Sequence, residues 1–241
     1  MKISLDLSKS IYENASVYYE EAKKLEGKKL RLLALRKVVP VKQKQPELKE
    51  RRGWFTQFHY FFTSNNFLVV SGKDAKQNDL LYSKHLTPED LFFHAEIVGA
   101  SATILKAMGK KPSEQDELEA SQFAACYSRA WKQSYYSCDV YRVTGENISK
   151  YSQGEVVGKG AFMILGERKW FKNTELKLKI GVEKNFLAVL PFNSSKRLDH
   201  QVVLVPGQVP KEKLAKEMAR KYKAREEELL KVIPGDSNIV E

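Results

Sequence analysis

The sequence predicts an α+β protein in which a largely antiparallel sheet with packed helices follows a short basic helical hairpin. Three observations predict this class. Short β-type runs follow one another with few helices between them after residue 66, as is typical of antiparallel sheets. Helical spacing of apolar residues is confined to the two ends of the chain and one central segment. The hydrophobic content of 42% is enough to build a core.

The first 52 residues are predicted to form the hairpin, which would be a truncated coiled coil. Apolar residues of the first helix recur at alternating spacings of four and three; they are Ile11, Ala15, Tyr18, Ala22 and Leu25. Pro40 and Pro46 bracket a polar turn, because each disfavours helix in the preceding residue. Phe55, Phe58 and Phe62 have helical spacing and predict a second helix that folds back on the first.

Strands and helices alternate irregularly through the rest of the chain. Strands are predicted at residues 67–71, 80–83, 91–94, 102–106, 139–143, 161–165, 176–182, 186–190 and 201–205. Ser113 and Asp116 have the spacing of a capping box and open a helix that extends to about Gln133. Pro210 begins a last charged helix over residues 211–231, which ends before Pro234.

The chain is strongly basic, with 41 lysines and arginines against 30 acids and a formal charge of +11. Such a balance attracts polyanions, of which RNA, DNA and anionic membranes are the candidates. No segment approaches the ~20 apolar residues of a membrane span, and the N-terminus has no apolar signal region. Two cysteines are too few for a disulfide scaffold, so we expect a cytoplasmic protein without membrane attachment.

Two short patterns resemble catalytic motifs without completing them. His94 and Glu96 have the His-x-Glu spacing of zinc deaminases, but Cys126 and Cys138 lie twelve residues apart and neither follows a proline. The segment 154–160 is one residue short of a phosphate-binding P-loop and ends in glycine where a hydroxyl would bind magnesium. We therefore expect no enzyme activity, no metal and no cofactor. The glycine-flanked Lys159 could still approach a phosphate, although a plain turn explains it equally well.

Several basic residues stand beside aromatic ones, a pattern that RNA-binding surfaces use to stack bases and hold the backbone. Burial of the same aromatics in the core is the competing interpretation. The candidate RNA-binding residues with a charged or stacking role are Lys73, Lys106, Arg129, Trp131, Lys132, Arg142, Lys159, Arg168 and Lys169.

Four blocks, in the right order, resemble the NFACT-R domain. Residues 72–79 resemble its Gly-Arg-Asp-Ala-x-x-Asn-Glu element, and residues 90–100 resemble its Asp-x-x-x-His-Ala-Asp-x-x-Gly-Ala signature. Residues 124–131 and 160–164 resemble the next two blocks. The chain departs from the family at Ala161, Leu165 and Glu96, where serine, arginine and aspartate are usual. Asn78 and His94 of these motifs join the RNA-site candidates, although loop-closing hydrogen bonds are the preferred interpretation of both.

The resemblance implies a function for each part of the chain. NFACT proteins include the ribosome quality-control factors RqcH and NEMF, which bind a stalled large ribosomal subunit and recruit tRNA. It implies an RNA-binding core at residues 53–166, which would bind rRNA or tRNA at the large subunit. The hairpin at 1–52 precedes this core, and strands and a charged helix at 167–241 follow it. The family's N-terminal and helix-hairpin-helix domains have no counterpart in these residues. A protein-interaction scaffold that pairs with a separate N-terminal NFACT polypeptide is the alternative.

Overall fold

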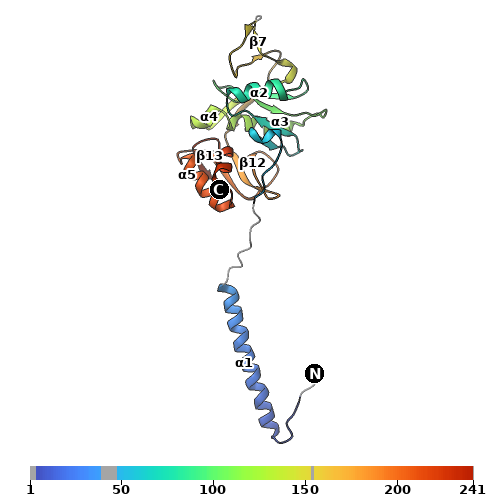
Figure 1. The fold of residues 1–241 in the computed structure, drawn as a ribbon, viewed down its shortest axis with the longest axis vertical. Coiled ribbons are helices and arrows are strands. Elements are labelled where there is room, and N and C mark those ends of the chain that lie inside the picture. The colour runs from blue at the N-terminus through green and yellow to red at the C-terminus, as the bar shows by residue number, and fades with distance from the viewer. Residues whose placement is uncertain (1–3, 39–47, 153–154, 241) are drawn as a thin grey trace. The chain divides into compact units, whose positions relative to one another are not determined.

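The computed structural model describes residues 4–38, 48–152 and 155–240 (Figure 1). The chain divides into two compact units, residues 1–46 and residues 47–241. Each unit is described on its own below.

In its described residues, 4–38, the first unit contains one helix, α1 (Ile11–Val38), which continues through Gly27. A capping box begins it: the Ser10 backbone N–H donates to Glu13 at 2.7 Å, and the Glu13 N–H donates to the Ser10 hydroxyl at 3.2 Å. The predicted apolar seam is exposed to solvent, with Ile11 84% and Leu25 61% accessible. In the part of the chain that the structure describes, this seam therefore has no covering element.

The predicted second helix, and with it the hairpin, is wrong. The three phenylalanines instead span a 3-10 turn, η1 (Trp54–Gln57), and the first strand, β1 (His59–Phe62). Phe58 and Phe61 are 2% exposed, so apolar spacing across a turn–strand boundary imitated a helical period. The predicted turn at Pro40 and Pro46 lies outside the described residues.

Six antiparallel strands form the main sheet of the second unit, in the order β1-β2-β4-β3-β5-β10. The strands after β1 are β2 (Leu68–Ser71), β3 (Leu91–Ala95), β4 (Thr103–Leu105), β5 (Ser137–Thr144) and β10 (Lys169–Glu175). Helices cover both faces (Figure 1). Leu81 packs with Phe92 and Ile104 on one face, and Phe123 packs with Phe93 on the other, as the two-residue alternation of strands requires.

The covering helices begin at side-chain caps. On the Phe92 face lies α2 (Ala75–His85), where residues 80–83 were wrongly predicted to be a strand. Asp74 accepts the Gln77 N–H at 2.8 Å and begins this helix. The other face is covered by α3 (Glu114–Cys126), which has the predicted Ser113–Asp116 capping box. The predicted helix breaks at Tyr127 because Ser128 caps a new short helix, α4 (Arg129–Lys132).

Between β5 and β10 the chain forms small hairpins. These consist of η2 (Gly145–Asn147), β6 (Ile148–Ser149), β7 (Tyr151–Ser152), β8 (Glu155–Val156) and β9 (Met163–Ile164). Strand β6 pairs with β9, and β7 pairs with β8.

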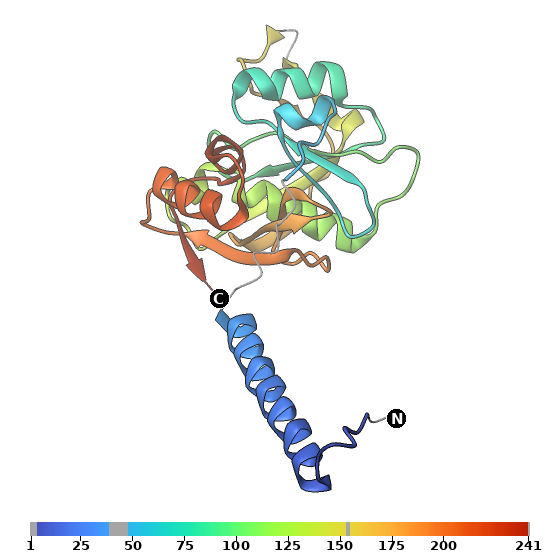
Figure 2. The same cartoon turned by 60° about the horizontal axis from the view of Figure 1, so that its bottom comes forward.

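A four-stranded sheet, ordered β12-β11-β13-β14, completes the second unit (Figure 2). Its elements are β11 (Leu178–Glu183), β12 (Phe186–Pro191), β13 (Asp199–Pro206), α5 (Lys211–Tyr222), α6 (Glu226–Val232) and β14 (Ser237–Val240). The single helix predicted over residues 211–231 is wrong, because Lys223 takes a left-handed conformation with φ +53 and ends α5. None of the described helices is long and apolar enough to cross a bilayer.

Candidate nucleic-acid interface

Six cationic side chains line a cleft of about 920 Å³ in the second unit. The start of α2, the β3–β4 loop, α4, the loop before β9 and both C-terminal helices line it. Among the described residues, the cations of its lining are Lys73, Arg129, Lys132, Lys159, Lys211 and Lys231. The one acid in the same lining is Asp74, so the cleft has a strong excess of positive charge. Such a site favours an anionic ligand.

The first wall of the cleft is the turn that leads into α2. The Gly72 N–H donates to the Ala102 carbonyl at 3.0 Å, and the Ala102 N–H donates to the Asn78 side-chain oxygen at 3.1 Å. A Cβ on Gly72 would lie only 2.2 Å from that oxygen, so the position requires glycine. This pair of hydrogen bonds ties α2 to β4 and holds Lys73 at the mouth of the cleft.

The second wall is the loop that joins β3 to β4. Gly99 has φ +76, and a Cβ there would lie 2.7 Å from the Nε of Arg129. The guanidinium group therefore lies directly against the loop backbone. His94, at the end of β3, is half-buried, and burial is the main cause that lowers its pKa. A neutral imidazole at neutral pH suits the structural role that the sequence favoured for this residue.

The third wall is the loop that carries Lys159, and it is attached to α2. The Gly160 N–H donates to Asp79 Oδ1 at 3.0 Å, and the Nζ of Lys150 lies 2.5 Å from the same oxygen. Burial raises the pKa of Asp79, but the hydrogen bonds from Lys150 and Gly160 lower it on balance. A Cβ on Gly160 would lie 2.6 Å from that of Ala75, so the loop can approach the helix only with glycine there.

Several cations of the cleft lie close enough to repel one another. Burial lowers the pKa of Lys73, and the charges of Lys231 and Lys211 lower it further. Burial and then the charge of Lys132 lower the pKa of Lys211. His59 is half-buried at the same place; burial, followed by the charges of Lys73 and Lys211, holds its pKa well below the usual range. A bound anion would relieve this repulsion.

Six predicted site residues line the cleft: Lys73, Asn78, His94, Arg129, Lys132 and Lys159. Arg168 lies at its margin, with the guanidinium 4.5 Å from the ring centre of Tyr141, which is itself a lining residue. These residues belong to the 72–79 and 90–100 motifs, to α4 and to the loop before β9. The fold brings these segments together although they are distant in sequence.

The other predicted residues are buried or form ion pairs with acids of the protein. Lys106 forms an ion pair with the buried Asp90 and donates to the His85 carbonyl at 2.6 Å. Trp131 is 1% exposed, and its Nε1 lies 3.2 Å from both the Asp236 carbonyl and the Ser237 hydroxyl. Buried in this way, its indole has no free face on which a base could stack.

Glu117 forms ion pairs with two more of the predicted RNA-binding residues. Its carboxylate lies 3.4 Å from the Arg142 guanidinium and 2.7 Å from the Lys169 ammonium. Both cations are therefore neutralised on the side of the sheet that faces α3. Sequence proximity to aromatic residues identified these positions but could not identify the glutamate, which lies at least 25 residues away.

The sequence analysis missed Lys211, Lys231 and His59 as members of the cleft. The two lysines were considered only as parts of a charged helix, and the histidine had no motif around it. The sequence around them gave one indication, Pro210, which marks the start of α5 and so places Lys211 at the beginning of that helix. In the described part of the chain no group of three or more histidine, cysteine, aspartate or glutamate residues could hold a metal.

Comparison with known proteins agrees with the motifs that frame the cleft. Residues 57–166 match the family described as the NFACT protein RNA binding domain. The archaeal Rqc2 homolog aRqcH of Methanocaldococcus jannaschii is 35% identical over 99% of this chain and 40% of its own length. The ribosome quality control complex subunit NEMF homolog of Drosophila melanogaster is 32% identical over 73% of this chain and 19% of its own length.

A solved structure resembles the chain more weakly. The C-terminal part of the fibronectin/fibrinogen-binding protein from Streptococcus suis gives a TM-score of 0.42 at 19% identity, over 56% of this chain and 50% of that one. The chain spans less than half the length of the curated relatives described above. The ordered motifs, the family match and the relatives together identify residues 57–166 as an NFACT-R domain and the chain as a member of the NFACT family.

Proposed function

We propose that the second unit binds RNA through its basic cleft and serves a cytoplasmic ribosome quality-control factor, without a catalytic step of its own. The observation that carries the proposal is the convergence of six cations, from five separate segments of the chain, on a cleft framed by the family motifs. Those motifs supply backbone turns and close approaches rather than a nucleophile or a metal site.

The relatives support the setting of the proposal. Their names place them in ribosome quality control, and the matching family is described as RNA binding. We extend this to rRNA or tRNA at the large ribosomal subunit as the ligand of this chain. Crosslinking in cells, followed by sequencing of the attached RNA, tests the extension; recovery of only messenger RNA would contradict it.

The salt dependence of binding tests the RNA-binding proposal itself. If about five phosphates are engaged, log affinity plotted against log salt concentration should fall with a slope of roughly −3.5 to −4.5. A flat response, or no binding of RNA at low salt, would refute the proposal.

The exposed seam of α1 favours a second role, as a docking surface for a separate N-terminal NFACT polypeptide. Ala15 and Ala22 are exposed on α1, as are the larger Ile11 and Leu25. Replacing both alanines with aspartate would bury unpaired charge at such an interface and weaken docking. The test is a pull-down from the native organism with the original chain and with the double variant. If the original chain recovers no NFACT-N-type partner, this second role fails.

A further inference from the structure

We propose that the cleft accepts an unpaired stretch of RNA, with a base against an apolar part of the lining and phosphates against the lysine cluster. This inference rests on the RNA-binding proposal and specifies the form of nucleic acid that the site takes. It follows from the division of the lining into two chemically different sets of residues.

The apolar set comes from the β3–β4 loop and from the segment around β9. Ile97, Val98, Ala161, Phe162 and Ile164 all line the cleft. Val98 is 85% exposed and Ala161 is also exposed, while Phe162 is half-buried. Ile97, Phe162 and Ile164 also pack against the hydrophobic core. Val98 and Ala161 are exposed apolar surface in the cleft, which contact with a charged backbone alone would not require.

Phe162 is held in place by its neighbours. Its ring lies 5.6 Å from that of Phe92 and 5.5 Å from that of Tyr82, and the Lys150 ammonium lies 4.4 Å from its centre. The Nζ of Lys150 also donates to the Ala161 carbonyl at 2.7 Å. This aromatic side chain is therefore ordered before any ligand binds, which reduces the entropic cost of stacking a base on it.

The cationic set is provided by other elements. Lys73 precedes α2, Lys211 opens α5, and Lys231 lies near the end of α6. After burial, the charges of Lys231 and Lys211 lower the pKa of Lys73, so the three ammonium groups lie close together. A flexible single strand can bend so that its phosphates meet this cluster while its base reaches the apolar set.

A duplex does not match this arrangement. The faces of its bases are covered by stacking, and the outside of the helix presents phosphate and sugar. The cleft volume of about 920 Å³ also falls within the range of roughly 300–1,000 Å³ that encloses small-molecule ligands. It therefore suits a few unpaired nucleotides and not the side of a helix.

A row of aromatic and cationic side chains continues from the cleft onto the edge strand β10. Tyr141 lines the cleft and lies 5.4 Å from Trp170, which is 38% exposed. The cations of Arg168 and Lys172 lie 4.5 Å and 4.2 Å from these two rings, respectively. Mixed aromatic and cationic surfaces of this kind are typical of sites for single-stranded nucleic acid.

The experiment measures the affinity of the full chain for a 5′-labelled single-stranded RNA and for a blunt-ended RNA duplex with strands of the same length, at low salt. We expect the single strand to bind at least about tenfold more tightly. Phe162→Ala should lower single-strand affinity by about 5- to 150-fold, the range found when one stacking partner is removed. Duplex affinity should be unchanged by this substitution.

Val98→Ser is a test variant that should fold normally, because this side chain is 85% exposed. It should lower single-strand affinity by several-fold and leave the thermal unfolding midpoint unchanged. Equal binding of both RNAs, with no effect of either substitution in folded protein, would overturn the inference and leave RNA binding intact. Failure to bind either RNA would refute the RNA-binding proposal as well.

Discussion

The double substitution Lys73→Ala and Lys231→Ala tests whether the lysines of the cleft contact RNA phosphates. Both are exposed lining residues, and both lie in the cluster whose charges repel one another. Each phosphate contact with a single strand contributes about 0.7 to the slope of log affinity against log salt. Loss of two contacts should therefore make the slope less steep by about 1.4. At a salt concentration of about 0.1 M this corresponds to a roughly 25-fold loss of affinity.

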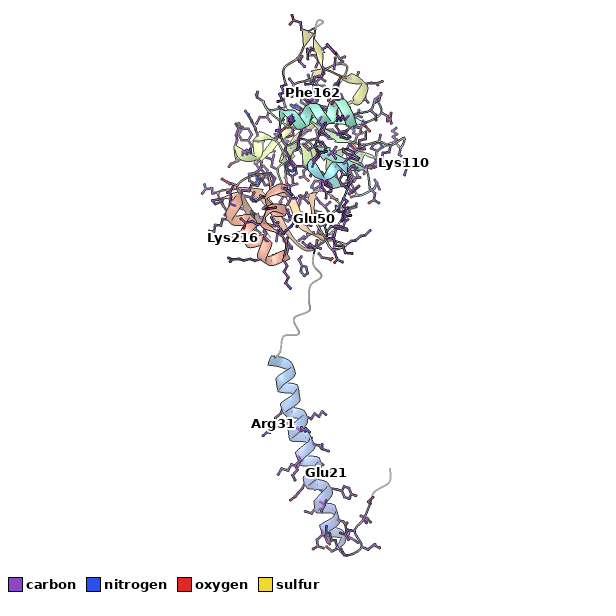
Figure 3. The ribbon with its side chains drawn as sticks, in the orientation of Figure 1. Glu21, Arg31, Glu50, Lys110, Phe162 and Lys216 are labelled. Atoms are coloured by element: carbon purple, nitrogen blue, oxygen red, sulfur yellow. The ribbon has the colours of Figure 1, made fainter. Side chains whose placement is uncertain are left out.

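A charge-matched control separates local contacts from the effect of total charge. Lys110→Ala and Lys216→Ala remove the same charge from exposed positions that do not line the cleft (Figure 3). Fluorescence anisotropy with a labelled single-stranded RNA, at five or six salt concentrations, gives the slope for each protein. We expect the control to keep the slope of the unmodified chain to within about 0.3, since distant exposed charges are largely screened.

The two variants can also contradict the assignment of the cleft. If they lower affinity equally and change the slope equally, the attraction comes from net charge and not from a site. If only the control weakens binding, the RNA-binding surface lies elsewhere on the second unit. Either result, in protein with an unchanged unfolding midpoint, would refute the reasoning.

Three further predictions concern the framework of the cleft. Because the pKa of His59 is lowered in the folded chain, only the unfolded chain binds a proton at this residue as the pH falls below about 6.5. The free energy of unfolding, measured in urea, should therefore fall by up to about 1.4 kcal/mol per pH unit. His59→Gln should reduce this dependence on pH. Gly72→Ala should cost about 1–3 kcal/mol, because its Cβ would overlap Asn78, whereas Gly158→Ala, with open space around its Cβ, should change thermal stability by less than about 0.5 kcal/mol. Purified protein should contain no stoichiometric zinc by elemental analysis; one tightly bound zinc per chain, lost in His94→Ala, would contradict the view that the His-x-Glu pattern is not a metal site.

Local patterns predicted the elements that have a clear signal in adjacent residues. The strand at residues 91–94 is a continuous apolar run, and the capping box at Ser113 and Asp116 is a contact between near neighbours; both appear in the structure. Residues 80–83 were predicted to be a strand but are part of α2. A short apolar run is compatible with a strand or a helix, and here the Asp74 cap favours the helix. The short strand β14 was missed because its pairing with β13 is made with residues more than thirty positions away.

The candidate site shows the same division between local and distant information. Resemblance to a family identified the motif glycines, and the basic residues near motifs and aromatics included Lys73 and Arg129. It could not distinguish free cations from paired ones, since pairing depends on acids distant in sequence, such as Glu117 for Lys169. Trp131 had the best local context for stacking and is a core residue, because its partners come from the last strand of the chain.

The motif residues are better explained as supports of the cleft than as contacts with the ligand. Gly72, Gly99 and Gly160 each permit a close approach, respectively to Asn78, to Arg129 and to Ala75. None of these approaches involves a reacting group, and each fixes one wall of the cleft. The free cations stand on or beside these walls, so a change at a motif glycine would displace several phosphate contacts together. On this view, a glycine substitution should weaken RNA binding more than the loss of any single lysine.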